Sequence, residues 1–73
     1  MKNYVKEKRR SSGLTQKQLA QRAGITQATV SRIESGVPPS LWVALLIAHA
    51  LDAPVEDLFA LDTDDIPDVF KSI

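Results

Sequence analysis

The chain has 73 residues, and nine basic side chains balance nine acidic ones, so its formal net charge is zero. It has no cysteine, which excludes disulfides and thiolate chemistry, and its single histidine leaves too few ligands for zinc, so we expect no metal and no cofactor. Residues 41–48 form the longest apolar run, too short for a bilayer, and the first ten residues lack the apolar stretch of a signal peptide. We expect one small, soluble, cytoplasmic domain whose thin core depends on well-formed helices or a partner subunit.

The zero net charge hides a division along the chain. Residues 1–36 carry eight basic and two acidic side chains, a formal charge of +6, whereas residues 37–73 carry one basic and seven acidic side chains, a charge of −6. A basic half in so short a chain favours a polyanion such as nucleic acid as partner. A solvated surface with segregated charge is the alternative reading of the same pattern.

Glycines, prolines and capping residues divide the chain into helices. Each of the three glycines follows an amphipathic stretch, where a left-handed residue ends a helix. The predicted N-caps are Asn3, Thr15, Thr26 and Ser40, with a capping box between Thr15 and Gln18 and with Pro54 in the first turn of the last helix. The predicted helices span residues 3–12, 16–23, 27–35, 41–51 and 54–60. Residues 1–3 and the stretch after Phe59 are candidates for a brief strand pairing.

Apolar residues recur at helical spacing and predict a single core. The expected core residues are Val5, Leu14, Leu19, Ala20, Ala23, Ile25, Val30, Ile33, Leu41, Ala44, Leu45, Ala48, Leu51, Val55, Leu58 and Phe59. The tail, residues 61–73, combines four aspartates with several apolar side chains, and it is either frayed or a docking segment.

Residues 16–35 have the pattern of two short helices that cross steeply at a tight turn. Gly24 supplies the turn, and Ala20 is small where the two helices approach each other. This stretch resembles the helix-turn-helix of the Cro/CI-type (XRE) DNA-binding family. The similarity covers roughly residues 2–60, including PSL at 39–41 and EDLF at 56–59, and is greatest to the short stand-alone regulators of that family.

The resemblance implies an all-α, compact five-helix, lambda-repressor-like DNA-binding domain over residues 1–60, with the helix-turn-helix at about 16–35. It also implies a homodimer on a palindromic operator in double-stranded DNA, with the third helix in the major groove. A helix over residues 27–35 is about 13 Å long, which suits a groove roughly 12 Å wide.

The outward face of that third helix carries side chains suited to reading base edges. Glutamine pairs with adenine, arginine with guanine, and a small apolar group contacts the thymine methyl. A solvated helix charge is the alternative role for Arg32. The predicted base contacts are Gln27, Ala28, Thr29, Ser31 and Arg32.

Phosphate contacts are predicted beside this face. The resemblance implies that Gln16 bonds a phosphate while bracing Gln27. It also implies a largely buried ion pair between Arg9 and Glu34, which would neutralise a carboxylate beside the DNA backbone. The predicted phosphate contacts are Gln16, Thr26, Ser35, Lys8 and Arg10, of which the last two are alternatively just solvated.

Two features depart from the family pattern. The loop 36–40 is about one residue short and lacks the basic residue that commonly contacts phosphate there. The fourth helix is apolar on two faces, since Trp42, Leu46 and Ala50 form a second stripe, and with Phe70 of the tail they are the predicted partner interface. The alternative is that Trp42 folds back over the tail against Phe70.

Three classes of function follow from these residues. The first is a homodimeric, sequence-specific DNA-binding transcriptional regulator. The second is an antitoxin-like or other protein-interaction module on the same scaffold, holding a partner protein through the fourth helix and the acidic C-terminal half. An enzyme is the weakest reading, because there is no phosphate-cradling glycine run, no metal cluster and no set of nucleophile, histidine and acid.

Overall fold

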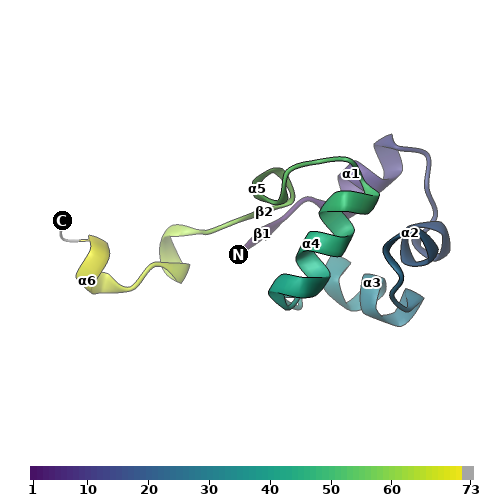
Figure 1. Cartoon of the computed structure of the whole chain (residues 1–73). Coiled ribbons are helices and arrows are strands. Elements are labelled where there is room, and N and C mark those ends of the chain that lie inside the picture. The colour runs from purple at the N-terminus through teal and green to yellow at the C-terminus, as the bar shows by residue number, and fades with distance from the viewer. Residues whose placement is uncertain (72–73) are drawn as a thin grey trace.

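The computed structural model describes residues 1–71, with side chains described for residues 1–69. Five helices form the body of the molecule, and two short strands, a 3-10 turn and a terminal helix complete it (Figure 1). The elements are β1 (Lys2–Asn3), α1 (Val5–Ser11), α2 (Gln16–Ala23), α3 (Gln27–Glu34), α4 (Leu41–Ala50), α5 (Val55–Leu58), β2 (Phe59–Ala60), η1 (Thr63–Asp65) and α6 (Asp68–Lys71). The predicted all-α, five-helix fold is confirmed.

The two strands close the body by pairing its two ends. β1 and β2 run antiparallel, with Lys2 opposite Ala60 and Asn3 opposite Phe59. The brief pairing expected from the sequence is therefore present. It also ends the fifth helix earlier than predicted, because residues 59 and 60 are in the strand. At the other end, Pro54 is the N-cap of α5 and not part of its first turn, so the helix also begins one residue later than predicted. Within residues 1–71, no helix has the length and apolar composition that crossing a bilayer requires.

Side-chain caps fix the starts of three helices, as predicted. The hydroxyls of Thr15, Thr26 and Ser40 accept backbone N–H groups three residues later, at 3.1, 3.1 and 3.2 Å. Gln18 completes the capping box by accepting the backbone N–H of Thr15 at 2.9 Å. Asn3 differs from the expectation, because α1 begins after Tyr4.

The Asn3 side chain instead joins two elements. Its Oδ1 accepts the backbone N–H of Val5 at 3.0 Å, and its Nδ2 donates to the backbone carbonyl of Ile33 at 2.6 Å. The first strand is thereby tied both to the start of α1 and to the end of α3.

Gly24 makes the turn between α2 and α3. Its φ of +73° lies in the left-handed region, where a side chain is strained, and its N–H still reaches the carbonyl of Ala20. A Cβ placed on Gly24 would meet nothing within 4 Å. The turn therefore needs glycine for its backbone conformation and not for space.

The core agrees with the prediction except in α4. Leu41 and Leu45 are exposed, so their predicted place in the core is wrong, and Ile47, which the prediction omitted, is fully buried. The reason is that nine of the ten residues of α4 are apolar, so periodicity cannot distinguish its faces. The other expected core residues are either buried or packed against the core from partly buried positions.

Residues 61–71, which we name the arm, leave the body beyond β2 (Figure 1). The radius of gyration is 13.2 Å, compared with about 11 Å for a compact chain of this length, and the extended arm accounts for the difference.

The base of the arm is held by the N-terminal amine, which lies 2.6 Å from a carboxylate oxygen of Asp65 and 3.4 Å from one of Asp62. The hydrogen bond to Asp65 raises the pKa of this exposed amine above its ordinary value.

Candidate nucleic-acid interface

α3 lies against the body on one side and is open to solvent on the other. Val30 and Ile33 are buried, in contact with a core to which α2 contributes Leu19, Ala20 and Ala23. The residues predicted to read bases lie on the opposite side. Gln27, Ala28, Ser31 and Arg32 are exposed, and Thr29 is half-buried.

Two hydroxyls predicted to contact phosphate already have partners at the ends of α3. The hydroxyls of Thr26 and Thr29 lie 2.8 Å apart, and Thr26 also accepts the N-cap hydrogen bond. The Ser35 hydroxyl donates to the carbonyl of Arg32 at 2.7 Å. Since a hydroxyl has one proton, Ser35 has to release this carbonyl before it can donate to a phosphate.

The predicted ion pair between Arg9 and Glu34 is present and almost entirely buried. Nε of Arg9 donates to Oε2 of Glu34 at 2.7 Å, and Nη2 donates to Oε1 at 3.0 Å, so the pair is bidentate. The remaining guanidinium nitrogen, Nη1, donates to the carbonyl of Leu14 at 2.8 Å. The Glu34 side chain is only 3% exposed, so α1 supplies the counter-ion for a carboxylate at the C-terminal end of α3.

Hydrogen bonding decides the ionisation of Glu34. Burial alone raises the pKa of this carboxyl, but the hydrogen bonds from Arg9 and Gln16 outweigh burial, and the pKa lies below its ordinary value. Glu34 is therefore charged at neutral pH, and its charge is matched inside the protein.

Gln16 has a different partner from the predicted one. Its Nε2 donates to Oε1 of Glu34 at 3.1 Å, so this amide braces Glu34 and not Gln27. A carboxylate is a stronger acceptor than a neutral amide, and α2 and α3 bring the two side chains together at the C-terminal end of α3. The sequence offered no local signal for this contact, since it joins residues 18 positions apart.

The other predicted phosphate contacts lie on α1. Lys8 and Arg10 are exposed, in contrast to Arg9 between them. The remaining basic side chains of residues 1–36, namely Lys2, Lys6, Lys17, Arg22 and Arg32, are exposed as well. Arg9 has its guanidinium committed to the protein interior, and Nζ of Lys2 lies 3.9 Å from a carboxylate oxygen of Asp62, so six of the eight cations of this half are available to a polyanion.

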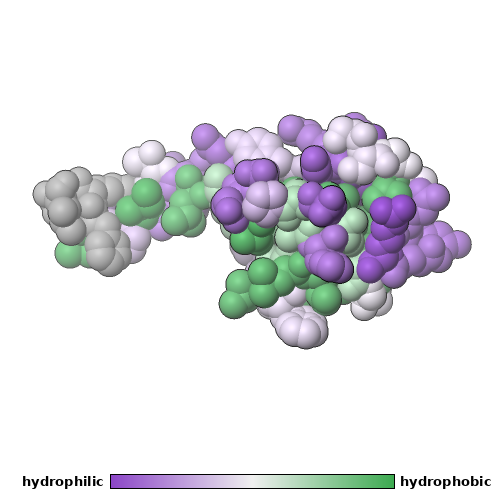
Figure 2. All heavy atoms as spheres, turned by 45° about the horizontal axis from the view of Figure 1, so that its top comes forward, coloured by the Kyte–Doolittle hydropathy of each residue, from purple (hydrophilic) through white to green (hydrophobic). Residues whose placement is uncertain are grey.

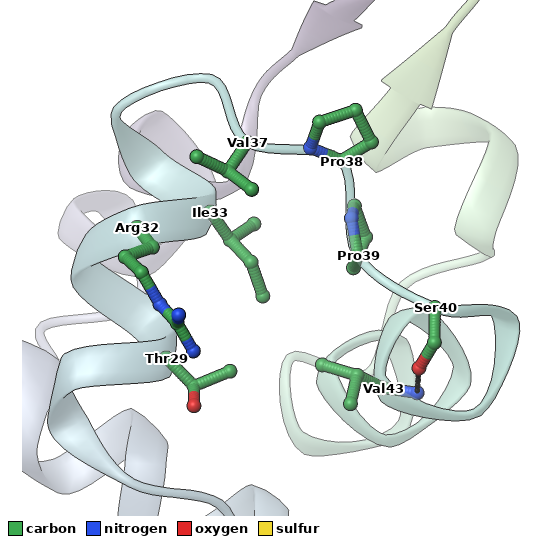
Figure 3. A pocket seen from close by; sticks show the side chains of 8 residues that line it. All are labelled: Thr29, Arg32, Ile33, Val37, Pro38, Pro39, Ser40 and Val43. Carbon is green, nitrogen blue, oxygen red and sulfur yellow. Dashed lines mark hydrogen bonds between the residues drawn. The ribbon is translucent and has the colours of Figure 1, made fainter.

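A groove runs between α3 and the N-terminal end of α4, and the sequence did not indicate it (Figure 3). It has a volume of about 330 Å³. Thr29 and Arg32 form one wall, and Val43 and Ser40 form the opposite one, below the loop of Val37, Pro38 and Pro39. The groove therefore places a cation beside apolar walls, at the edge of the surface that α3 exposes.

The residues of α4 that were predicted as a partner interface differ in their exposure. Trp42 is exposed, whereas Leu46 and Ala50 are half-buried and pack against the core. The exposed apolar residues of α4 are Leu41, Trp42 and Leu45, and we name these three residues the α4 face. The exposure of Trp42 contradicts the alternative in which it folds back over the tail. The Phe70 side chain lies outside the described residues.

Comparison with known proteins adds a family to this geometry. A family model described as helix-turn-helix matches residues 5–58, which include all five helices of the body. An uncharacterised HTH-type transcriptional regulator of Methanothermobacter thermautotrophicus is 44% identical over 66 residues, covering 88% of this chain and 96% of that protein. The uncharacterised HTH-type transcriptional regulator YgzD of Bacillus subtilis is 42% identical over 66 residues, covering 89% of this chain and 100% of its own length.

These matches extend over nearly the whole length of both relatives, so they concern the complete domain and not the turn alone. The helix-turn-helix that the family model describes corresponds in this structure to α2 and α3, which are joined at Gly24. Regulators of this kind bind DNA and are not enzymes. The chain belongs to the XRE-type helix-turn-helix family of DNA-binding transcriptional regulators.

Proposed function

We propose that this protein binds double-stranded DNA sequence-specifically as a homodimer, with α3 in the major groove and Gln27, Ala28 and Arg32 reading base edges. The observation that carries the proposal is the electrostatic arrangement of α3. Its polar side chains Gln27, Ser31 and Arg32 are exposed, and its one carboxylate, Glu34, is buried and neutralised by Arg9. The surface turned outward therefore presents donors and a cation to the DNA without a competing negative charge.

Phosphate contacts would position this helix. The Gln16 amide has two N–H donors, and Glu34 takes one of them, so the second can bond a phosphate. The exposed side chains of Lys8 and Arg10 on α1 supply positive charge without base specificity. Two copies of α3 in a dimer would lie about 34 Å apart, to meet successive major grooves of a palindromic operator.

Selection of bound sequences from random duplex DNA, followed by band-shift titration of variants, tests the proposal. We expect a palindrome with half-sites about one helical turn apart. Arg32→Ala should weaken binding of the dimer to the selected site by at least about 30-fold and relax the preference at one base pair of each half-site, since a bidentate base contact contributes about 1–3 kcal/mol and the dimer loses two of them.

Arg22→Ala is the matched control, because it removes the same charge from an exposed position on α2. It should weaken binding equally on all sequences, through the salt-dependent phosphate interaction alone. If Arg32→Ala and Arg22→Ala lose affinity in the same way on selected and unrelated DNA, Arg32 does not read a base.

A further inference from the structure

Among the described residues, the most exposed large hydrophobic side chains lie on α4 of the body and along the arm, and hydrophobic atoms are visible on both (Figure 2). On the body they form the α4 face, where Leu41 is 74%, Trp42 71% and Leu45 48% exposed. Nine of the ten residues of α4 are apolar, and the tenth is His49. A helix that is apolar all round is normally covered all round. Within the described residues, the body buries Ala44, Ile47 and Ala48 and partly covers their neighbours on α4, but it leaves the α4 face open.

We infer that a second copy of this chain covers the α4 face, with the two α4 helices side by side about a two-fold axis and the two Trp42 side chains in the contact. The inference rests on the proposed homodimer and says where its interface lies. A two-fold contact uses the same patch on both copies, so the patch must tolerate meeting itself. The α4 face meets this condition, because none of its three side chains is charged.

The position of α4 relative to α3 fits this arrangement. The N-terminal end of α4 lies beside α3, since residues of both line the groove, and α4 then leads away from α3 (Figure 1). A two-fold axis along α4 therefore keeps both copies of α3 on the same side of the dimer. Two recognition helices on one side are what a palindromic site requires.

The α4 face alone is too small for a stable dimer. Its three side chains expose on the order of 300 Å², whereas a specific interface buries roughly 800 Å² on each partner. The arm supplies a further surface, because it stands off the body and exposes Leu61 and Val69 (Figure 1). The arm of each copy lies on the other copy and completes the buried area.

The apolar chemistry of the α4 face also disfavours the DNA backbone as its occupant. A phosphate surface calls for cations and hydrogen-bond donors. Beyond its backbone, the α4 face offers one indole N–H among aliphatic groups.

The protein contains a single tryptophan, Trp42, which reports on its own burial. In sedimentation equilibrium without DNA, we expect the mass of two chains. Dilution to the monomer should shift the fluorescence of Trp42 to longer wavelength over the same concentration range.

Leu45→Glu should weaken the dimer about 1,000-fold. Each of the two copies places a charge in the contact, so the loss of binding free energy at this position is counted twice. Its circular dichroism should remain that of the wild type, since Leu45 lies outside the core.

Val37→Glu is the matched control. Val37 is also an exposed apolar residue, but it lines the groove on the α3 side. It should leave the dimer unchanged, whereas Leu61→Glu on the arm should weaken it about tenfold. A dimer that survives Leu45→Glu, or that dissociates on Val37→Glu, overturns the assignment of the interface. A chain that stays monomeric with an exposed Trp42 also overturns it and leaves the face to a different partner.

Binding to a single operator half-site separates this inference from the proposed function. Monomeric Leu45→Glu should still prefer the selected half-site over unrelated DNA, because α3 is unchanged. A wild-type dimer with a buried Trp42 but no sequence preference would refute the proposed function and support the interface. Sequence-specific binding by a dimer that Leu45→Glu does not weaken would support the proposed function and refute the interface.

Discussion

Replacing Arg9 by methionine tests whether the buried ion pair holds α3 in place. Methionine keeps much of the side-chain volume, but it leaves the Leu14 carbonyl without its Arg9 donor and the Glu34 carboxylate without a counter-ion, with the Gln16 amide as its remaining donor. Breaking a buried ion pair by removing one partner costs about 3–5 kcal/mol. Since a domain of this length has a free energy of unfolding of about 4–11 kcal/mol, Arg9→Met should lose a large part of its stability and melt at least about 12 °C lower.

The pH dependence gives this loss a specific sign. In the wild type the pKa of Glu34 lies below its ordinary value of 4.5, so the stabilisation by the pair is fully present above pH 4.5 and is lost as the pH falls through the folded-state pKa. Without Arg9, burial dominates and raises the pKa of Glu34, so the variant loses stability as the pH rises. The stability difference between wild type and Arg9→Met is therefore largest at neutral pH and shrinks on acidification.

Urea denaturation followed by circular dichroism at neutral and acid pH measures both effects. Arg10→Met is the control, because it removes the same side chain from the adjacent, exposed position, and it should change stability by less than about 0.5 kcal/mol. Adding Glu34→Gln to Arg9→Met should restore part of the loss, since no buried charge remains. Equal losses for Arg9→Met and Arg10→Met, or a loss independent of pH, would refute the reasoning.

Three further changes test the local structure by thermal denaturation. Thr15→Ala removes the capping box of α2 and should cost about 1 kcal/mol; an unchanged Tm would mean that the cap contributes nothing. Gly24→Ala should cost about 1–2 kcal/mol through strain at positive φ alone, since its methyl group meets no atom, and a more stable variant would contradict this. Leu58→Ala should cost about 2–5 kcal/mol by opening a cavity in the core, and a loss below about 1 kcal/mol would show that the core closes around it.

Much of the path from sequence to site was predictable because it depends on short-range geometry. The caps at Thr15, Thr26 and Ser40 involve partners three residues away, and Gly24 acts through its own backbone angle. Such interactions are encoded in a few neighbouring residues, so the positions of α2, α3 and the turn followed from the pattern. The pairing of Arg9 with Glu34 came from family resemblance, since no local rule joins residues 25 positions apart.

The sequence by itself determined the succession of helices, the turn between α2 and α3 and the polar side of α3, since each rests on local propensity or on a clear polar-apolar contrast. Tertiary packing alone decided the orientation of α4, because a helix with apolar residues on every side turns whichever face fits the core. It buried Ile47 and exposed Leu41 and Leu45. The Gln16 contact and the groove beside Arg32 likewise exist only once distant segments meet, because their atoms come from separate elements.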